Sequence, residues 1–214
     1  MDKEQRKHGI PMAKQDVLDR IHNFYEVALG YTEEQAVAEA ERCLQCPNPL
    51  CVQGCPVDID IPAFIKEIKE KNFLAASAKL KEKNSLPAIC GRVCPQENQC
   101  QKFCVIGKMG DPISVGRLER FASDYERSKG VTIPAKQESS VKGKVAIVGS
   151  GPAGLTTAAD LVKLGYEVIM FESLHSTGGV LMYGIPEFRM PKDVVQAEVP
   201  LSTFDLPDER PMQP

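Results

Sequence analysis

The chain has 214 residues, of which 43% are hydrophobic, and a formal net charge of −3 at pH 7. This composition supports one or two hydrophobic cores and argues against a wholly disordered protein. The acidic balance offers no basic surface for nucleic acid or an anionic membrane, so neither is an expected partner. The N-terminal residues lack the apolar run of a signal peptide, and no stretch is apolar enough to span a bilayer. We therefore expect a cytoplasmic protein.

Helices are predicted on both sides of the first cysteine-rich segment. Thr32, with Gln35 three residues later, forms a capping box for a helix that runs to Arg42. A second helix begins at the sequence Asp-Ile-Pro of residues 60–62, and a third follows residue 72. Apolar residues recur at helical spacing in both, at Ile61, Phe64, Ile65 and Ile68 and then at Phe73, Ala76 and Leu80.

The eight cysteines all lie between residues 43 and 104, in two blocks. In a reducing cytosol such thiols are more often metal ligands than disulfides. Ferredoxin-like proteins bind one iron–sulfur cluster with closely spaced cysteines, while a following Cys-Pro reaches a second cluster. Both blocks contain a Cys-Pro, so we predict two clusters of the four-iron type, although the first block has four rather than two residues before its third cysteine. The blocks are Cys43-x2-Cys46-x4-Cys51-x3-Cys55-Pro56 and Cys90-x3-Cys94-Pro95-x4-Cys100-x3-Cys104.

Structural zinc is the competing interpretation of these thiols. Zinc also takes four thiolates, but its ligands usually form C-x2–4-C pairs separated by a dozen or more residues. The first block is too crowded for that arrangement, and soft thiolates suit iron–sulfur clusters. Iron–sulfur is therefore favoured over zinc, and disulfides are the least favoured.

A carboxylate is predicted on the buried face of a later helix. In the stretch VGRLERFASDYE, Val115, Leu118, Glu119 and Ala122 share the inward stripe. A buried carboxylate needs a partner. That partner is either an arginine such as Arg92, in a salt bridge, or an iron–sulfur cluster that Glu119 would bind as a ligand.

Residues 129–143 are predicted to be a linker, because they are polar and lack a helical apolar period. The stretch KVAIVGSGPAGLTTAADLVKLGYEVIMFES then predicts a strand, a glycine-rich turn, a helix and a second strand. The run from Val145 to Val148 is typical of a buried parallel strand, and Gly165 is expected to end the helix. The helix is expected to bury Leu155, Ala158, Ala159 and Val162.

The glycine-rich turn has the dinucleotide-binding pattern G-x-G-x-x-G. Gly149 suits the tight turn, Gly151 the close approach of pyrophosphate, and Gly154 the packing of helix against strand. The helix N-terminus would face the phosphates with its amides. Glu172, 18 residues after Gly154, is placed to bind ribose hydroxyls, which suits FAD or NAD and disfavours NADP at this site. The motif alone does not choose between FAD and NAD, but a second glycine-rich loop, Gly178-Gly179 with YGIPEFRMPKD, is suited to a flavin.

Several stretches together resemble one family of flavin and iron–sulfur proteins. They are GYTEEQAVAEAERCLQCPNPLCVQGCPVDIDIPAFI, CGRVCPQENQCQKFCVIGKMGDPISVGRLERFASD, VAIVGSGPAGLTTAADL and GGVLMYGIPEFRMPKD. The chain is similar to the small, beta-type subunit of NADPH-dependent glutamate synthase. The same module resembles the N-terminal part of dihydropyrimidine dehydrogenase and one subunit of an electron-bifurcating NADH-dependent ferredoxin:NADP oxidoreductase. The resemblance runs from about residue 11 to residue 199.

The resemblance implies two [4Fe-4S] clusters and FAD, with a partner redox subunit as electron acceptor. Simple counting would use all eight thiols, whereas the family takes one ligand from the position of Glu119 and leaves Cys90 outside, so that choice stays open. The first cluster would be bound by Cys43, Cys46, Cys51 and Cys104, and the second by Cys55, Cys94, Cys100 and Glu119. For FAD, the implied residues are Gly149, Ser150, Gly151, Pro152, Ala153, Gly154, Glu172, Ser173, Gly178, Gly179, Val180 and Arg189.

The expected fold is α + α/β. Residues 1–128 would form an α-helical ferredoxin-like domain, residues 144–199 the first βαβ part of a Rossmann-like FAD-binding domain, and residues 200–214 a proline-rich diverged or disordered tail. No second G-x-G-x-x-G/A follows, and two strands seldom hold a sheet alone. We therefore expect an incomplete FAD domain and an NADPH site outside this chain. The isolated chain is expected to assemble its clusters, to bind FAD weakly and to be inactive with NADPH.

The predicted function is electron transfer from NAD(P)H through FAD and the clusters to a partner. The partner expected from the resemblance is the large subunit of glutamate synthase, which forms glutamate from glutamine and 2-oxoglutarate. A subunit of pyrimidine-reducing or electron-bifurcating type is the alternative, because the same electron path serves different acceptors. A non-catalytic iron–sulfur relay module without its own flavin is a further alternative.

Overall fold

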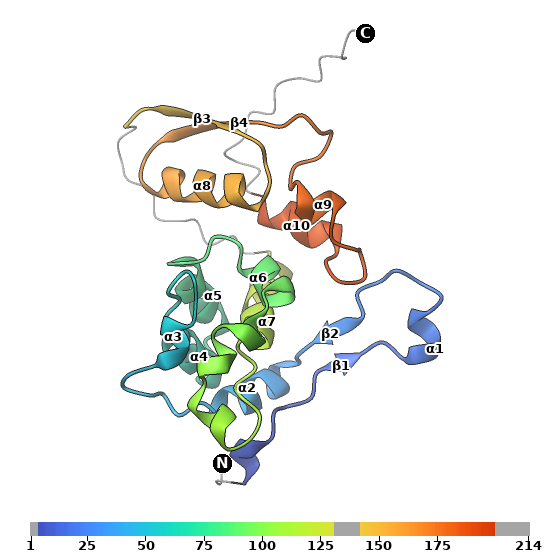
Figure 1. Ribbon diagram of the computed structural model, residues 1–214, viewed down its shortest axis with the longest axis vertical. Coiled ribbons are helices and arrows are strands. Elements are labelled where there is room, and N and C mark those ends of the chain that lie inside the picture. Colours follow the sequence, from blue (N-terminus) through green and yellow to red (C-terminus); the bar gives the residue numbers. More distant parts are fainter. Residues whose placement is uncertain (1–3, 131–141, 200–214) are drawn as a thin grey trace. The chain divides into compact units, whose positions relative to one another are not determined.

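The computed structural model describes residues 4–130 and 142–199, which fall into two compact units divided near residue 133. Most of the predicted linker, residues 131–141, and the predicted tail, residues 200–214, lie outside the described residues. The first unit is helical and the second contains a βαβ element (Figure 1). The expected succession of an α domain and an α/β segment is therefore observed.

The first unit packs its longer helices around one apolar core. Phe64, Ile65, Ile68, Leu80 and Leu118 are almost completely buried in it. The helices of this unit are α1 (Val17–Arg20), α2 (Glu33–Glu41), α3 (Leu50–Gln53), α4 (Ile61–Lys69), α5 (Phe73–Lys81), α6 (Pro87–Val93) and α7 (Val115–Ser128), with 3-10 turns η1 (Gln5–Lys7), η2 (Gln96–Asn98), η3 (Gln101–Phe103) and η4 (Val105–Lys108).

The helix predictions in this unit are confirmed at the level of individual caps. Thr32 and Gln35 hydrogen-bond reciprocally at the start of α2, with the Gln35 amide 3.2 Å from the Thr32 hydroxyl. Asp60 accepts from the backbone amide of Ala63 at 3.2 Å and so caps α4. On α7, Glu119 is buried, as the inward stripe predicts.

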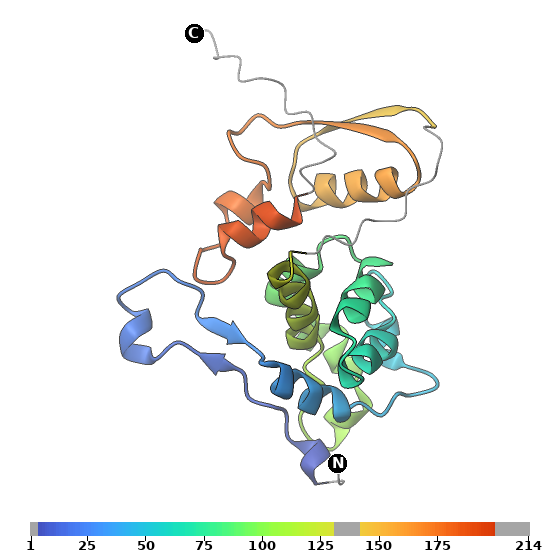
Figure 2. The same cartoon turned by 180° about the vertical axis from the view of Figure 1, so that it is seen from behind.

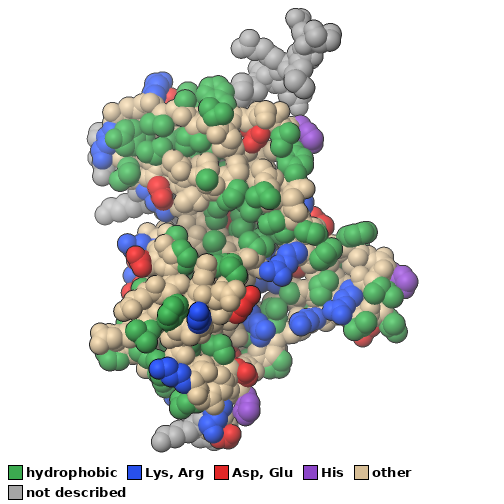
Figure 3. All heavy atoms as spheres, in the orientation of Figure 1, with side chains coloured by type: hydrophobic (Ala, Val, Ile, Leu, Met, Phe, Trp, Pro, Cys, Tyr) green, Lys and Arg blue, Asp and Glu red, His purple; other side chains and the backbone are tan. Residues whose placement is uncertain are grey.

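An arm that the sequence did not predict precedes α2. Strands β1 (Ala13–Lys14) and β2 (Ala28–Gly30) pair antiparallel and are connected through α1. Both views show this arm extending away from the helices of its unit (Figures 1 and 2). Hydrophobic side chains are visible on its surface (Figure 3). Leu18 and Tyr25 of this arm are 71% and 76% exposed.

The second unit begins with the predicted strand, turn, helix and strand. Strands β3 (Lys144–Val148) and β4 (Glu167–Phe171) pair parallel in the described residues, and α8 (Pro152–Lys163) lies between them in sequence. Gly165 follows α8 with a φ of +86°. Helices α9 (Val180–Tyr183) and α10 (Lys192–Glu198) complete the described part of this unit.

The burial of β3 differs from the prediction of a buried strand. Its side chains alternate between exposed and half-buried, and Val148 is 88% exposed. The reason is that α8 covers one face of the two-stranded sheet and buries Leu155 and Ala158, together with Val168 and Met170 of β4. A continuous apolar run is typical of strands covered on both faces, and the described residues cover only one. No helix within the described ranges is both long and apolar enough to cross a membrane.

Candidate functional site

Three cysteines that are close in sequence and one distant cysteine line one cavity in the helical unit. Cys43 and Cys46 follow α2, Cys51 lies in α3, and Cys104 lies between η3 and η4. Burial, together with the neighbouring Cys43 and Cys104, raises the pKa of the Cys51 thiol to about 11. Burial is also the main cause of the raised pKa of Cys43, with Cys104 and Cys46 adding to it. The fold therefore gathers four thiols that would repel one another as thiolates without a cation between them.

The wall of this cavity is largely apolar. Ile61 and Ile65 of α4 line it, together with Ile106 and Val115. Polar groups nevertheless point at two of the sulfurs, because the Ile113 amide lies 3.5 Å from Cys104 Sγ and Gln45 Nε2 lies 3.6 Å from Cys43 Sγ. An apolar shell and hydrogen bonds to sulfur are the features by which proteins set the potential of iron–sulfur clusters.

Three further cysteines and one carboxylate form a second group. Cys55 follows α3, Cys94 ends α6, Cys100 precedes η3, and Glu119 lies on α7. Burial, followed by the charges of Glu119 and Cys55, raises the pKa of Cys94 to about 11. Burial and the neighbouring Cys55, Glu119 and Cys94 raise the pKa of Cys100 to about 12. The structure therefore brings together the four residues that the family resemblance implies for a second cluster.

Cys90, the alternative to Glu119 as a ligand, has its sulfur directed at the side chain of Asn84. Its sulfur lies 3.7 Å from Asn84 Oδ1. The amide of Asn84 in turn donates to Glu119 Oε1 at 2.8 Å. Cys90 thus contacts the second group through Asn84, which no pattern in the sequence indicates as a site residue.

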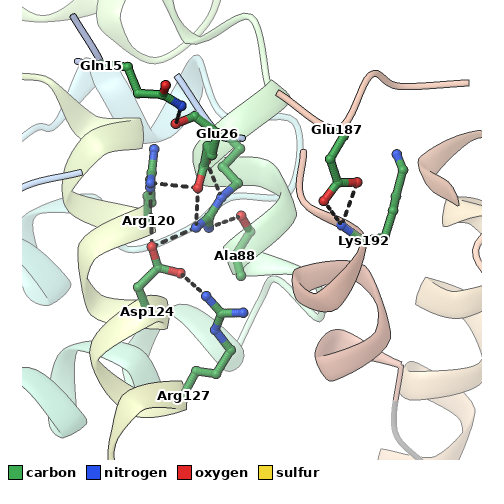
Figure 4. Close-up of polar contacts among 9 residues, drawn as sticks. Gln15, Glu26, Ala88, Arg120, Asp124, Arg127, Glu187 and Lys192 are labelled. Atoms are coloured by element: carbon green, nitrogen blue, oxygen red, sulfur yellow. Dashed lines mark hydrogen bonds and ion pairs between the residues drawn. The ribbon is translucent and has the colours of Figure 1, made fainter. Parts of the chain in front are cut away.

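Arg92, which the sequence offered as a salt-bridge partner for Glu119, forms ion pairs with Glu26 and Asp124. Figure 4 labels Glu26, Asp124 and Arg120 of this ion-pair network. Arg92 lies 2.9 Å from Glu26 and 2.8 Å from Asp124, while Arg120 lies 3.0 Å from Glu26 and 3.2 Å from Asp124. The Arg92 side chain is 2% exposed. This network joins the arm to α6 and α7, which carry Cys94 and Glu119. The only signal for it in the sequence is the i, i+4 spacing of Arg120 and Asp124.

A second buried ion pair lies beside the first group of cysteines. The Glu39 and Arg42 side chains are both fully buried, with Nη1 2.5 Å from Oε1. Arg42 directly precedes Cys43 and also donates to the carbonyl oxygen of Asp111 at 2.5 Å. Glu39 accepts from the amide of Ser114 at 2.7 Å. The pair therefore fixes the loop whose Ile113 amide points at Cys104.

The donor sets fit the chemistry that the sequence predicts for them. Four thiols form one group, and three thiols with a carboxylate form the other, each with buried or half-buried sulfurs. Thiolates are the usual ligands of iron–sulfur clusters, and an oxygen donor in the fourth place leaves the set soft overall. Within residues 4–130 and 142–199, no three His, Cys, Asp or Glu side chains are arranged to hold a single metal ion. The histidines His8, His22 and His175 are exposed.

The dinucleotide-binding turn lies between β3 and α8. Gly149 has a φ of +94°, which favours glycine, and Gly151 has open space where a side chain would begin. A Cβ at Gly154 would overlap the carbonyl oxygen of Gly149. The three glycines therefore meet the three geometric demands of the fingerprint. Pro152 and Ala153 form the exposed first turn of α8.

The second glycine-rich loop packs directly against this turn. The Gly178 amide lies 3.0 Å from the Ser150 hydroxyl and 3.1 Å from the Ser150 carbonyl oxygen. A Cβ on Gly179, whose φ is +53°, would lie 2.8 Å from Gly151 Cα. The structure thus assembles two loops that the sequence predicted to serve one cofactor. Ser173, Val180 and Arg189 are exposed near or within the second loop.

Glu172 is anchored to the fingerprint turn. Its carboxylate accepts from the amide of Ser150 at 2.9 Å, from the Ser150 hydroxyl, and from the Leu174 amide at 2.9 Å. These hydrogen bonds, of which the Ser150 hydroxyl has the largest effect, lower its pKa to about 2. The group is therefore a fixed anion beside the turn. Oε2 accepts both bonds from Ser150, so a ribose hydroxyl would bond to Oε1, in place of the long contact from the Ser173 hydroxyl at 3.4 Å.

Comparison with known proteins adds two family matches and several relatives. Residues 20–131 match the family model of dihydropyrimidine dehydrogenase domain II, 4Fe-4S cluster, and residues 147–212 match that of an NAD(P)-binding Rossmann-like domain. The NAD-dependent dihydropyrimidine dehydrogenase subunit PreT of Escherichia coli (strain K12) is 40% identical over 188 residues, or 88% of this chain and 44% of the relative. The glutamate synthase [NADPH] small chain of Azospirillum brasilense is 34% identical over 189 residues, or 88% and 39%, and that of Escherichia coli (strain K12) is 36% identical over 172 residues, or 80% and 36%. The chain thus spans less than half the length of these relatives.

Proposed function

Because the chain belongs to the dihydropyrimidine dehydrogenase domain II, 4Fe-4S cluster family, we propose that it is an electron-transfer part of an oxidoreductase. It would carry electrons from NAD(P)H through FAD and two [4Fe-4S] clusters to a partner. The observation that supports this proposal is that two groups of four potential ligands lie in one helical unit.

In this proposal the first group binds one cluster through Cys43, Cys46, Cys51 and Cys104, and the second group binds another. The fourth ligand of the second cluster is Glu119, because its charge acts on both Cys94 and Cys100. Bound clusters of this type accept and release one electron at a time. The chain's own residues keep water away with apolar walls, hold the sulfurs in place and direct amides at them.

The fingerprint turn and the second glycine-rich loop would hold FAD. Backbone amides at the start of α8 would face the pyrophosphate, and Gly151 leaves room for its approach. Glu172, ionised at neutral pH, would accept from ribose hydroxyls. FAD supplies the step between a two-electron hydride and single electrons.

The acceptor is proposed to be the large subunit of a glutamate synthase. A second candidate is the other subunit of an NAD-dependent dihydropyrimidine dehydrogenase, because the relative with that name is 40% identical, against 34% and 36% for the two glutamate synthase small chains. The two are separated by mixing the dithionite-reduced, desalted chain with each candidate subunit and following the return of visible cluster absorbance. The acceptor is the subunit that binds the chain and reoxidises its clusters.

The test of the proposed cofactors is anaerobic purification with iron, labile sulfide, zinc and flavin measured per chain. We expect iron and sulfide at the level of two four-iron clusters, and half of that level in Cys51→Ala. Zinc without iron or sulfide would replace the proposal with a zinc-bound interaction domain. Clusters without any binding of added flavin would favour the iron–sulfur relay module that has no flavin of its own.

A further inference from the structure

The side chain of Asn84 links the two residues between which the sequence could not choose. It lies in the connection between α5 and α6 and is 6% exposed. Its Nδ2 donates to Glu119 Oε1 at 2.8 Å. Its Oδ1 accepts from the Leu86 amide at 3.0 Å and faces Cys90 Sγ at 3.7 Å. The amide is thus bonded on both sides inside the helical unit.

These contacts determine the orientation of the Asn84 amide. The Leu86 backbone amide is an obligatory donor, and the Cys90 thiol is a weak one. Flipping the side chain would place its NH2 against both donors and its oxygen against a carboxylate. The NH2 group must therefore face Glu119, and the bonds from Leu86 and Cys90 hold it there.

We propose that Asn84 is a positioning residue, which holds the Glu119 carboxylate in the pose in which it binds the second cluster, with Cys90 acting through Asn84 rather than as a ligand. This inference rests on the proposed function, because it presupposes a cluster in the second group. A glutamate side chain has three torsions, so a carboxylate that is not held in place loses conformational entropy when it binds. Outer contacts of this kind commonly contribute about 10–100-fold to metal affinity.

The most direct test is Asn84→Asp, which keeps the shape of the side chain and the acceptor for Leu86 but removes the donor to Glu119. Chelator-driven iron loss is followed in anaerobic protein, together with the electron paramagnetic resonance spectrum after reduction. We expect half of the iron to leave about 10–100-fold faster than in the parent chain. The other half should leave at the parent rate, and one of the two spectral signatures should change.

Asn72→Ala is the matched control, because Asn72 makes the same amide-to-carboxylate contact with Glu67, at 3.1 Å, but on the surface. We expect it to leave both iron-loss phases and both spectra unchanged. Asn84→Ala serves as the second variant in case Asn84→Asp fails to fold, and circular dichroism verifies folding of each. Cys90→Ser keeps a donor toward Asn84 and should behave more like the parent than Cys90→Ala.

A double-variant cycle separates positioning from general destabilisation. In a Glu119→Ala background, Asn84→Asp should have no further effect on iron loss, because the residue that it positions is gone. Additive effects in the cycle, or an Asn84→Asp variant that matches Asn72→Ala, would overturn the inference while the clusters remain. Loss of half the iron in Cys90→Ser, with full iron in Glu119→Ala, would make Cys90 the ligand and also overturn it. Absence of iron and sulfide from the parent chain would instead refute the proposed function.

Discussion

The buried pair of Glu39 and Arg42 allows a quantitative prediction for Glu39→Gln. Neither side chain is accessible to solvent. The two carboxylate oxygens of Glu39 face three donors: Arg42 Nη1 at 2.5 Å and the Ser114 amide at 2.7 Å on one oxygen, and the Ile10 amide at 2.8 Å on the other. A glutamine has a single oxygen, so one of its orientations turns NH2 toward Ile10 and the other turns it toward Arg42 and Ser114.

The expected cost follows from this geometry. Glu39→Gln leaves the buried guanidinium without its counter-charge and places at least one donor against another. Removing one partner of a buried ion pair costs about 3–5 kcal/mol in the free energy of unfolding. For a chain of this length, each kcal/mol lowers the unfolding midpoint by about 2–4 °C, so the decrease should be roughly 6–20 °C.

The assay is thermal unfolding followed by circular dichroism, on parent and variant samples of equal iron content, because a bound group stabilises the folded state by mass action. Glu82→Gln is the control, since its pair with Lys79 is also spaced i, i+3 and is largely exposed, with Nζ 2.8 Å from Oε1. Exposed pairs contribute about 0–1 kcal/mol. Equal midpoints for Glu39→Gln and Glu82→Gln would refute the reasoning that burial makes this pair indispensable.

Three further predictions concern other contacts. Gly91→Ala should lower the unfolding midpoint by the equivalent of about 1–3 kcal/mol, because its Cβ would lie 2.5 Å from the backbone nitrogen of Arg120; an unchanged midpoint would contradict this close helix crossing. Ser150→Ala should raise the pKa of Glu172 from about 2 toward its ordinary 4.5. In the parent, this carboxylate stabilises the fold above about pH 4.5, and that contribution is lost as the pH falls toward 2; the variant should have a smaller contribution. A carboxyl titration by nuclear magnetic resonance that stays near 2 in the variant would contradict this prediction. Glu26→Gln should cost about 2 kcal/mol, between the values for exposed and buried pairs, and should speed amide exchange in residues 13–30; protection that stays at the parent level would show that the network does not hold the arm.

The parts of the fold that the sequence predicted correctly depend on neighbours within one or two helical turns. The capping box at Thr32 and the inward position of Glu119 are local patterns, because the period of a helix decides which side chains share a face. The turn at Gly149 is equally local, since a positive φ favours glycine. For such features, knowledge of the rest of the chain adds little.

The features that the sequence did not reveal depend on contacts between distant segments. Glu26 and Arg92 are 66 residues apart, and Asn84 and Glu119 are 35 apart. A lone asparagine between two helices is most simply interpreted as a turn or cap residue, so nothing local marks Asn84 as the contact of a buried carboxylate. The exposed side of β3 was missed for a related reason, because an apolar run indicates the strand but not which elements cover it.

The spacing of the cysteines places members of both four-residue groups on the same backbone turns. Cys51 and Cys55 stand at the two ends of one turn, and each belongs to a different group; Cys100 and Cys104 repeat this arrangement. The two turns pack against each other, because a Cβ at Gly54 would overlap the ring of Phe103 and lie 3.0 Å from the Gln99 carbonyl oxygen. Each turn therefore carries one residue of either group, and a shift of one turn displaces residues of both. In the proposed function, the backbone of these two turns would hold the two clusters at a fixed separation, so that single electrons could pass from one to the other.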